Sequence, residues 1–205
     1  MDALTDFFPG LTPLQQERFA AMEELYRTWN ARINVISRKD IDQMRIHHIL
    51  HSLSIAKVVR FPEGSTVLDA GTGGGFPGIP LAVLFPEVRF TLCDSIGKKI
   101  RVAQAVAEGL QLDNVSCVNA RIEALPGPYD FVVSRAVADL SVFYPWVKGK
   151  VRSAAFFLKG GELDEEIDAC ARRCRIERDR FLEVPLSRWF TDPWFDGKKI
   201  VVISQ

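Results

Sequence analysis

The chain has 205 residues, 47% of them hydrophobic and 25% charged, which is typical of a folded globular protein and excludes an intrinsically disordered one. This length suits one sizeable domain, and no apolar run approaches the roughly 20 residues that span a bilayer. The 26 basic and 26 acidic residues cancel, so the chain lacks the basic surplus that is typical of nucleic-acid-binding proteins.

Helical patterns fill the N-terminal third. A helix is predicted from Leu14 to Arg32, with Thr12 as its N-cap and Pro13 at its first position. A second helix is predicted from about Asp40 to Val59, where the apolar spacing is less regular. The acidic residues near the N-terminus do not resemble a secretory signal, which begins with basic residues, and we expect a cytoplasmic protein.

From Thr66 onward, strand and helix patterns alternate. Alternation of this kind predicts a doubly wound α/β fold, with a parallel sheet and helices on both of its faces. The last two strand patterns follow one another without a helix, which predicts an antiparallel hairpin at one edge. We expect one domain, with a helical segment at 1–62 and an α/β core at 63–205. The predicted strands are Thr66–Ala70, Arg89–Cys93, Val115–Val118, Phe131–Ser134, Ala154–Leu158, Ile176–Val184 and Lys199–Ile203, and the predicted helices are Ile79–Leu84, Lys98–Leu110, Leu140–Val147 and Leu163–Arg173.

A glycine-rich loop follows the first predicted strand, and it contains Gly71, Gly73 and Gly75. Glycines at such a turn let the backbone bend sharply and approach a ligand closely. In open α/β sheets, ligands bind in the crevice beyond the carboxyl ends of the strands. A glycine turn with a purely structural role is the alternative.

Three features favour a cationic nucleoside ligand over a dinucleotide. Phe76 stands where the dinucleotide-binding fingerprint has its third glycine. Asp69 precedes the loop, where its negative charge suits a sulfonium and an amino group better than a phosphate. Asp94 ends the second strand, where a carboxylate can accept both ribose hydroxyls.

The segment Gly71–Ala82, GTGGGFPGIPLA, resembles the signature of the ribosomal RNA small-subunit methyltransferase G family, also called glucose-inhibited division protein B. The resemblance extends from Asn30 to Ile203. Its other matching segments are Asn34–Asp40, His48–Leu50, Ser52–Leu53, Leu92–Ser95, Gly97–Lys99, Ala120–Glu123, Ser134–Ala136, Leu158–Gly160 and Lys199–Ile203.

The resemblance implies a Rossmann-like class I methyltransferase with a seven-stranded sheet and an N-terminal helical extension. It implies that S-adenosylmethionine is the cofactor and that the product is N7-methylguanine in the decoding-region loop of 16S ribosomal RNA. The family's cofactor contacts carry over to Gly71, Phe76, Ile122, Glu123 and Arg135. His51 departs from the pattern, because many members have Asp at that position, and a role assigned to that Asp does not transfer.

Arg135, after the fourth predicted strand, is the candidate catalytic residue. Its guanidinium could hold the cofactor carboxylate or an RNA phosphate, or stack on the target base. A structural salt bridge is the alternative. No general base is expected, because guanine N7 carries a lone pair and no proton, so that transfer mainly requires alignment of the reacting atoms.

Basic residues near the predicted crevice are candidates for contact with RNA, although each group could also be an ordinary solvated surface. They are Arg32, Arg38, Lys39, Arg45, Lys98, Lys99, Arg121 and Lys159. The expected partner is 16S ribosomal RNA, within the small subunit or an assembly intermediate of it, and we expect a monomer. The four cysteines contain no C-x-x-C pair, and we expect no metal site.

Other functions stay open at this point. The same chemistry could act on a small molecule or a protein, for which the zero net charge is the main argument. A nicotinamide-dependent oxidoreductase would use the same crevice. A protein that senses the cofactor without catalysis is a further alternative.

Overall fold

The computed structural model describes residues 3–37, 39–135 and 138–205. Seven strands form one sheet in the order β3-β2-β1-β4-β5-β7-β6. The first five pair in parallel, and β7 is antiparallel to both β5 and β6, as the final strand pair predicts. The strands are β1 Thr66–Ala70, β2 Arg89–Asp94, β3 Val115–Asn119, β4 Tyr129–Arg135, β5 Val151–Gly160, β6 Phe181–Pro185 and β7 Lys198–Ser204.

Strand order reverses beside β1, because the chain runs outward through β2 and β3 and then returns to add β4 on the other side. Such a reversal leaves a crevice at the carboxyl ends of the strands, which is where open α/β sheets bind ligands. The fold therefore provides the crevice that the glycine loop predicts.

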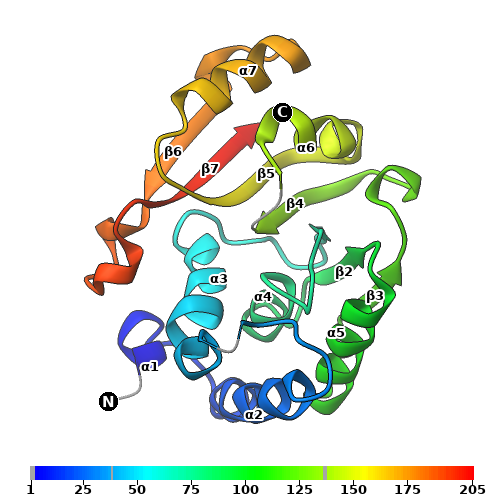
Figure 1. Cartoon of the computed structure of the whole chain (residues 1–205), viewed down its shortest axis with the longest axis vertical. Helices are drawn as coiled ribbons and strands as arrows, with labels where there is room; N and C mark the ends of the chain where they lie inside the picture. The colour runs from blue at the N-terminus through cyan, green and yellow to red at the C-terminus, as the bar shows by residue number, and fades with distance from the viewer. Residues whose placement is uncertain (1–2, 38, 136–137) are drawn as a thin grey trace.

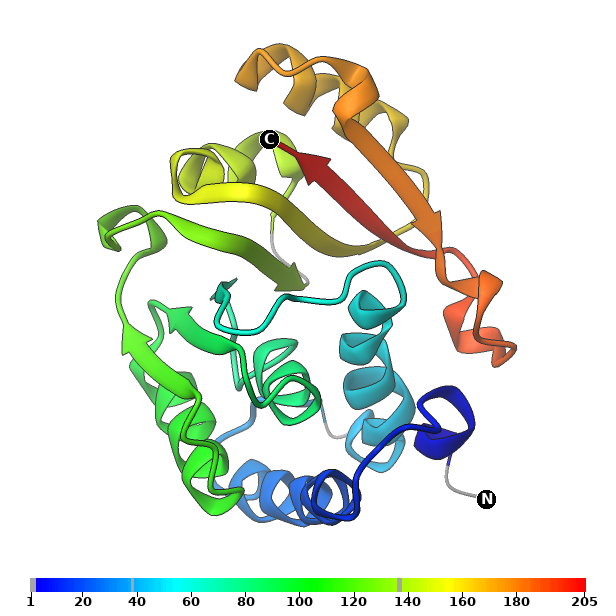
Figure 2. The same ribbon diagram turned by 180° about the vertical axis from the view of Figure 1, so that it is seen from behind.

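Helices cover both faces of the sheet, with α6 and α7 on one side and α2, α4 and α5 on the other (Figures 1 and 2). The α-helices are α1 Ala3–Phe7, α2 Pro13–Asn30, α3 His51–Leu53, α4 Gly78–Leu84, α5 Gly97–Gly109, α6 Leu140–Val147 and α7 Asp164–Cys174. The shorter helical turns are η1 Ile41–Gln43, η2 Arg45–Leu50, η3 Ser54–Lys57, η4 Ile122–Ala124, η5 Lys148–Lys150, η6 Arg178–Arg180, η7 Leu186–Arg188 and η8 Pro193–Phe195. None of the helices in the described ranges is long and apolar enough to cross a membrane.

Two hydrophobic cores result from the alternation of side chains along the strands. In β1, Val67 belongs to the core beneath α2, α4 and α5, whereas its neighbour Leu68 belongs to the core beneath α6 and α7. In β7, Ile200 and Val201 divide in the same way. All four side chains are fully buried, which explains the nearly continuous apolar runs of these strands.

The second N-terminal helix differs from the prediction. Residues 41–57 form a succession of 3-10, π and α turns instead of one regular helix, and Arg45–Leu50 is a π-helix. Met44 and Ile49, both buried, are five residues apart, and a π turn places residues at that spacing on one face. The apolar residues are irregularly spaced in the sequence because the number of residues per turn changes along this segment.

The sixth strand is shorter than predicted and begins at Phe181 instead of Ile176. Arg175 ends α7 in the left-handed conformation, and the Ile176 amide donates to the Ala171 carbonyl. Ile176 thus belongs to the helix C-terminus, where a hydrophobic residue after the left-handed position is common.

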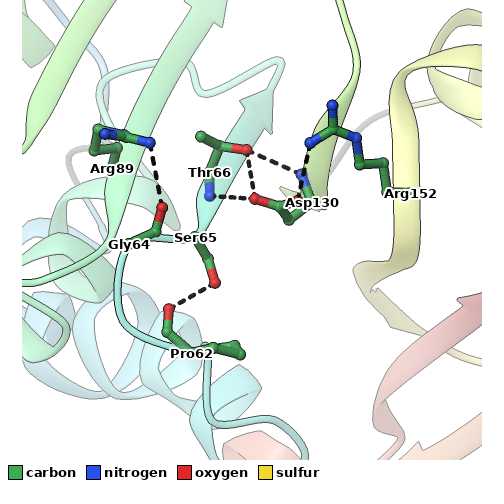
Figure 3. A network of polar contacts seen from close by, with 7 residues as sticks. All are labelled: Pro62, Gly64, Ser65, Thr66, Arg89, Asp130 and Arg152. Atoms are coloured by element: carbon green, nitrogen blue, oxygen red, sulfur yellow. Dashed lines mark hydrogen bonds and ion pairs between the residues drawn. The ribbon is translucent and has the colours of Figure 1, made fainter.

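A polar network at the amino-terminal end of β1 ties this strand to β4 (Figure 3). Asp130 Oδ2 accepts hydrogen bonds from both the amide and the hydroxyl of Thr66, each at 2.8 Å. The Thr66 hydroxyl in turn accepts from the Asp130 amide at 3.0 Å. Arg152 reaches the other carboxylate oxygen at 3.3 Å and is 58% exposed. These contacts fix the β1–β4 register at the end of the sheet opposite the crevice.

We expect Asp130→Ala to lower the free energy of unfolding by about 1–3 kcal/mol, because it leaves the Thr66 amide without its acceptor. Arg152→Ala should cost less than about 1 kcal/mol, since its ion pair is largely exposed. Urea denaturation measures both values. Equal losses for the two variants, or a change in cofactor affinity for either, would contradict this structural role.

Candidate active site

The buried carboxylate of Asp69 stabilises the glycine loop after β1 through hydrogen bonds. This carboxylate is fully buried, and its Oδ2 accepts hydrogen bonds from the Thr72 hydroxyl at 2.5 Å and the Gly78 amide at 2.7 Å. A Cβ on Gly78 would lie 2.6 Å from the same oxygen, so glycine is required there. Asp69 Oδ1 has no hydrogen-bond partner among the described residues. Asp69 therefore joins the two ends of the loop and keeps one oxygen unpaired.

Burial raises the pKa of Asp69 from 3.8 to about 7, against the opposing effect of its two hydrogen bonds. The folded protein therefore keeps this proton to a higher pH than the unfolded chain does. Between about pH 4 and pH 7, the contribution of Asp69 to stability falls as the pH rises, by at most about 1.4 kcal/mol per pH unit.

We expect Asp69→Asn to remove this pH dependence, because the Asn oxygen can accept both hydrogen bonds but does not ionise. The measurement is urea unfolding of wild type and variant at pH 5, 6 and 7. The stability of wild type relative to the variant should decrease across the series. Parallel curves would show that Asp69 does not titrate in this range.

Asp94, at the end of β2, anchors the same loop from the neighbouring strand. Its Oδ2 accepts from the Gly73 amide at 2.9 Å, and its Oδ1 accepts from the Ile96 amide at 2.8 Å. Each oxygen keeps a further lone pair. Asp94 is 9% exposed and borders a cavity, so these lone pairs lie within reach of a ligand.

A cavity of about 230 Å³ lies beyond the carboxyl ends of β1, β2 and β3, and we call it the β2–β3 cavity. It brings together five residues singled out from the sequence: Gly71, Asp94, Arg121, Ile122 and Glu123. Its other lining residues are Ser95, Ala120, Ala138, Phe143 and Trp146.

The β2–β3 cavity fits a nucleoside. The Asp94 carboxylate suits the vicinal hydroxyls of a ribose, and buried Ile122 with the two aromatic side chains of α6 suits a purine ring. The aromatic residues were not predicted, although α6 directly follows the loop after β4 and is therefore placed over the crevice.

Phe76 and Gly75 lie on the other side of the loop, against the N-terminal helix. The Phe76 ring stacks on Tyr26 at 4.6 Å, and the Tyr26 hydroxyl donates to the Gly74 carbonyl at 2.8 Å. A Cβ on Gly75 would lie 2.7 Å from the Tyr26 hydroxyl oxygen and 2.5 Å from Ile79 Cδ1. The ring of Phe76 does not line the β2–β3 cavity. Both residues pack the loop against α2, and only the backbone of the loop is available to a ligand.

Arg135, the last residue of β4, points away from the β2–β3 cavity. Its guanidinium donates to the His47 carbonyl at 3.2 Å and lies 2.9 Å from His48 Nδ1, and it covers the Phe76 ring at 4.8 Å. Burial lowers the pKa of Arg135 to about 10, so it is still a cation at neutral pH. Burial also lowers the pKa of His48 to about 3, which keeps Nδ1 free to accept.

No carboxylate pairs with Arg135 within the described ranges, in contrast to the salt bridge considered as an alternative. Its charge is held by a carbonyl, an imidazole and an aromatic face. Such an arrangement fixes the position of the guanidinium without neutralising it.

Arg135 borders a second, wider cavity of about 550 Å³ at the carboxyl ends of β4 and β5, which we call the β4–β5 cavity. Lys159 lies in its wall, paired with Glu166 at 2.5 Å, and donates to the Ala138 carbonyl at 3.3 Å. Ala138 lines the β2–β3 cavity, so the hydrogen bond from Lys159 joins the walls of the two cavities, which are therefore neighbours. The remaining lining residues are Val35, Asp40, His47, His48, His51, Leu158, Gly160, Trp194 and Lys198.

The predicted RNA-contacting residues do not form one continuous group. Arg121 and Lys159 line the two cavities. Arg45 pairs with Glu23, its Nε lying 2.5 Å from the carboxylate. Arg38 lies outside the described residues. On the surface, Arg32, Lys39 and Lys98 are exposed and Lys99 is half-buried.

A comparison with protein families matches residues 15–188 to the family described as GidB, rRNA small subunit methyltransferase G. Among curated proteins, the chain is 48% identical to the ribosomal RNA small subunit methyltransferase G of Christiangramia forsetii, over 99% of this chain and 96% of that protein. The protein of the same name from Flavobacterium johnsoniae is also 48% identical, over 98% of this chain and 96% of its own length.

The chain belongs to the rRNA small subunit methyltransferase G family. It is accordingly an S-adenosylmethionine-dependent methyltransferase, and the fold class and cofactor predicted from the sequence are confirmed.

Solved structures share the fold of this methyltransferase G chain at low sequence identity. One is the magnesium protoporphyrin IX methyltransferase of Synechocystis with bound S-adenosylmethionine, with a TM-score of 0.61 and 15% identity over 96% of this chain and 99% of that one. Another is a ribosomal protein L11 methylase from Lactobacillus delbrueckii, with a TM-score of 0.58 and 17% identity over 76% of this chain and 77% of that one.

The absence of a metal site concerns residues 3–37, 39–135 and 138–205, the part of the chain that the structure describes. This part contains no group of three or more His, Cys, Asp or Glu side chains arranged to hold a metal ion. The four cysteines are free thiols.

Proposed function

We propose that this chain transfers the methyl group of S-adenosylmethionine to N7 of a guanine in 16S ribosomal RNA. The observation that carries the proposal is the match, over nearly the full length, to relatives named for methylation of small-subunit ribosomal RNA. The two neighbouring cavities at the carboxyl edge of the sheet support it, since one suits a nucleoside cofactor and the other leaves room for a substrate.

Residues of the β2–β3 cavity would hold the cofactor. Asp94 would accept hydrogen bonds from the ribose hydroxyls, while Ile122 and Glu123 would border the adenine. The loop glycines Gly71 and Gly73, both at positive φ, would bring the backbone close to the methionine part. When bound, S-adenosylmethionine supplies an activated methyl group on a positively charged sulfur.

Asp69, which is buried beneath the glycine loop, would interact with this cofactor electrostatically. A nearby sulfonium and amino group would favour the ionised form of Asp69, and Asp69 also fixes the loop that carries Gly71 and Gly73. Phe76 contributes by packing the loop against Tyr26, with Gly75 allowing the close approach.

The reaction requires alignment of guanine N7 with the methyl carbon. It does not require removal of a proton, because N7 already carries a lone pair. A nucleophile held about 3–3.5 Å from the methyl carbon and in line with the breaking bond gains the rate advantage of proximity and orientation. Arg135 lies at the β4 carboxyl end, beside both the glycine loop and the β4–β5 cavity. Its fixed guanidinium is the best-placed group for positioning the substrate.

Basic residues singled out from the sequence would contact the RNA backbone. Arg32, Lys39 and Lys98 are exposed, and Arg121 borders the β2–β3 cavity. The substrate would be the small subunit or an assembly intermediate, met in the cytoplasm by a monomeric enzyme that is a single domain and uses no metal.

Deletion of the gene tests the proposal. The 16S RNA of the deletion strain should lack one N7-methylguanine, and the purified protein with S-adenosylmethionine should restore it. Unchanged methylation in the deletion strain would refute the proposal. Transfer to a small molecule or protein instead would support the alternative substrate class, and binding of NADH in place of S-adenosylhomocysteine would indicate an oxidoreductase.

A further inference from the structure

The β4–β5 cavity holds more positive charge than its acidic residues neutralise. Lys159 is paired with Glu166 at 2.5 Å, and Asp40 Oδ1 lies 3.0 Å from His47 Nδ1. The other two cations that line it, Arg135 and Lys198, have no carboxylate partner in the described part of the chain. An anionic ligand would complete the charge balance.

Lys198 is held in the wall of this cavity by an aromatic ring. It is the first residue of β7, and its Nζ lies 4.6 Å from the centroid of Trp194. Trp194 in turn stacks on His47 at 4.3 Å, with the rings 13° apart. A cation–π contact of this kind is worth only about 0.5–2 kcal/mol, and a phosphate can compete for the ammonium group.

The surroundings of Lys198 are built from distant parts of the chain. His47 comes from the π-helical turn η2, Arg135 from β4 and Lys198 from β7. His51 is 6% exposed, lines the same cavity and has an unpartnered Nε2, so the polar groups of this wall are incompletely satisfied.

We propose that the β4–β5 cavity receives the target nucleotide of the RNA and that Lys198 binds a phosphate beside the base. The cavity, at about 550 Å³, lies within the size range of small-molecule sites and adjoins the β2–β3 cavity through Ala138. Two cations without an ion-pair partner, together with the ring of Trp194, suit a ligand that carries both a negative charge and a flat ring. This inference rests on the proposed function. It adds where the target nucleotide binds and which residue contacts its phosphate.

The test compares Lys198→Ala with Lys199→Ala. Lys199 is the adjacent residue, carries the same charge, and pairs with Glu183 at 3.1 Å outside the cavity. Both variants are assayed for methylation of undermethylated small subunits, for binding of those subunits at several salt concentrations with S-adenosylhomocysteine present, and for binding of S-adenosylhomocysteine alone.

Lys198→Ala should raise KM about tenfold, since a hydrogen bond to a charged group is lost. It should also lower the slope of log affinity against log salt by about one, which a purely structural change would not do. Lys199→Ala and the charge-conserving Lys198→Arg should stay near wild type, and all variants should bind S-adenosylhomocysteine equally.

A wild-type salt slope in Lys198→Ala would overturn the inference, as would an equal loss in Lys199→Ala or a failure of Lys198→Arg to restore binding. These outcomes leave the proposed function intact, because wild type would still methylate the subunit. If wild type neither methylates nor binds the subunit, both the proposed function and this inference are wrong.

Discussion

Replacement of Arg135 by alanine is expected to lower kcat/KM for methylation by about 100- to 1000-fold, the typical loss when one fixed donor is removed from an active site. The guanidinium is held by the His47 carbonyl, by His48 Nδ1 and by the face of Phe76, so its position is defined before any ligand binds. Steady-state methylation of undermethylated small subunits measures the effect.

Arg152→Ala is the matched control, because Arg152 lies at the opposite end of the sheet, where its guanidinium pairs with Asp130. Binding of S-adenosylhomocysteine to Arg135→Ala should be nearly unchanged, since Arg135 does not line the β2–β3 cavity. If alanine lowers stability, Arg135→Lys keeps the charge and should still be impaired, because an ammonium group cannot replace the guanidinium fork. Wild-type turnover by a folded Arg135→Ala variant would refute a positioning role.

Asp94→Asn is expected to weaken the affinity for S-adenosylmethionine by about 100-fold. The carboxylate anchors the Gly73 and Ile96 amides, and its remaining lone pairs are those proposed to accept the ribose hydroxyls. Hydrogen bonds to a charged group contribute about 1.5–3 kcal/mol each, and Asn both removes the charge and replaces one of the two accepting oxygens by a donor. Isothermal calorimetry with the cofactor and with S-adenosylhomocysteine gives the affinities directly.

Asp113→Ala serves as the control for charge, because Asp113 is an exposed acid that does not line the β2–β3 cavity. The variant Asp94→Asn should retain its circular dichroism spectrum and should lose affinity for both nucleosides, since the ribose is common to them. Retention of wild-type affinity would remove Asp94 from the cofactor site.

Regular elements with a strong apolar pattern could be predicted closely. The first strand and the helix Leu140–Val147 begin and end at the predicted residues, and Thr12 caps α2 as expected. The apolar pattern indicates the boundaries of the first strand and of α6, and the capping residue Thr12 indicates the start of α2. The π-helical segment around His47 and His48 could not be predicted as such, because its turns change width from one to the next.

The residues of the candidate site divide between two environments that the sequence does not distinguish. Asp69 and Asp94 both flank the loop, yet only Asp94 borders the β2–β3 cavity, because Asp69 lies beneath the loop. Arg135 was expected at the crevice and lies there, but its partners, a carbonyl and an imidazole, come from a segment 87 residues away. Contacts between distant segments leave no local signal.

Trp194 and Lys198 illustrate the same limit. An aromatic residue shortly before a strand is usually a packing residue, and the stacking of Trp194 on His47 depends on contact between the β6–β7 connection and the distant turn η2. Their place in the β4–β5 cavity follows from the tertiary structure alone.

Transfer of a tritiated methyl group from S-adenosylmethionine to undermethylated small subunits tests the central claim most directly. The labelled RNA is hydrolysed to nucleosides, and a second portion is reduced and treated with aniline, which cleaves the chain at N7-methylguanine. We predict about one methyl group for each subunit, carried by N7-methylguanine, and a single site of cleavage in 16S RNA. Label in a ribosomal protein, in another base or on no component of the subunit would contradict the account.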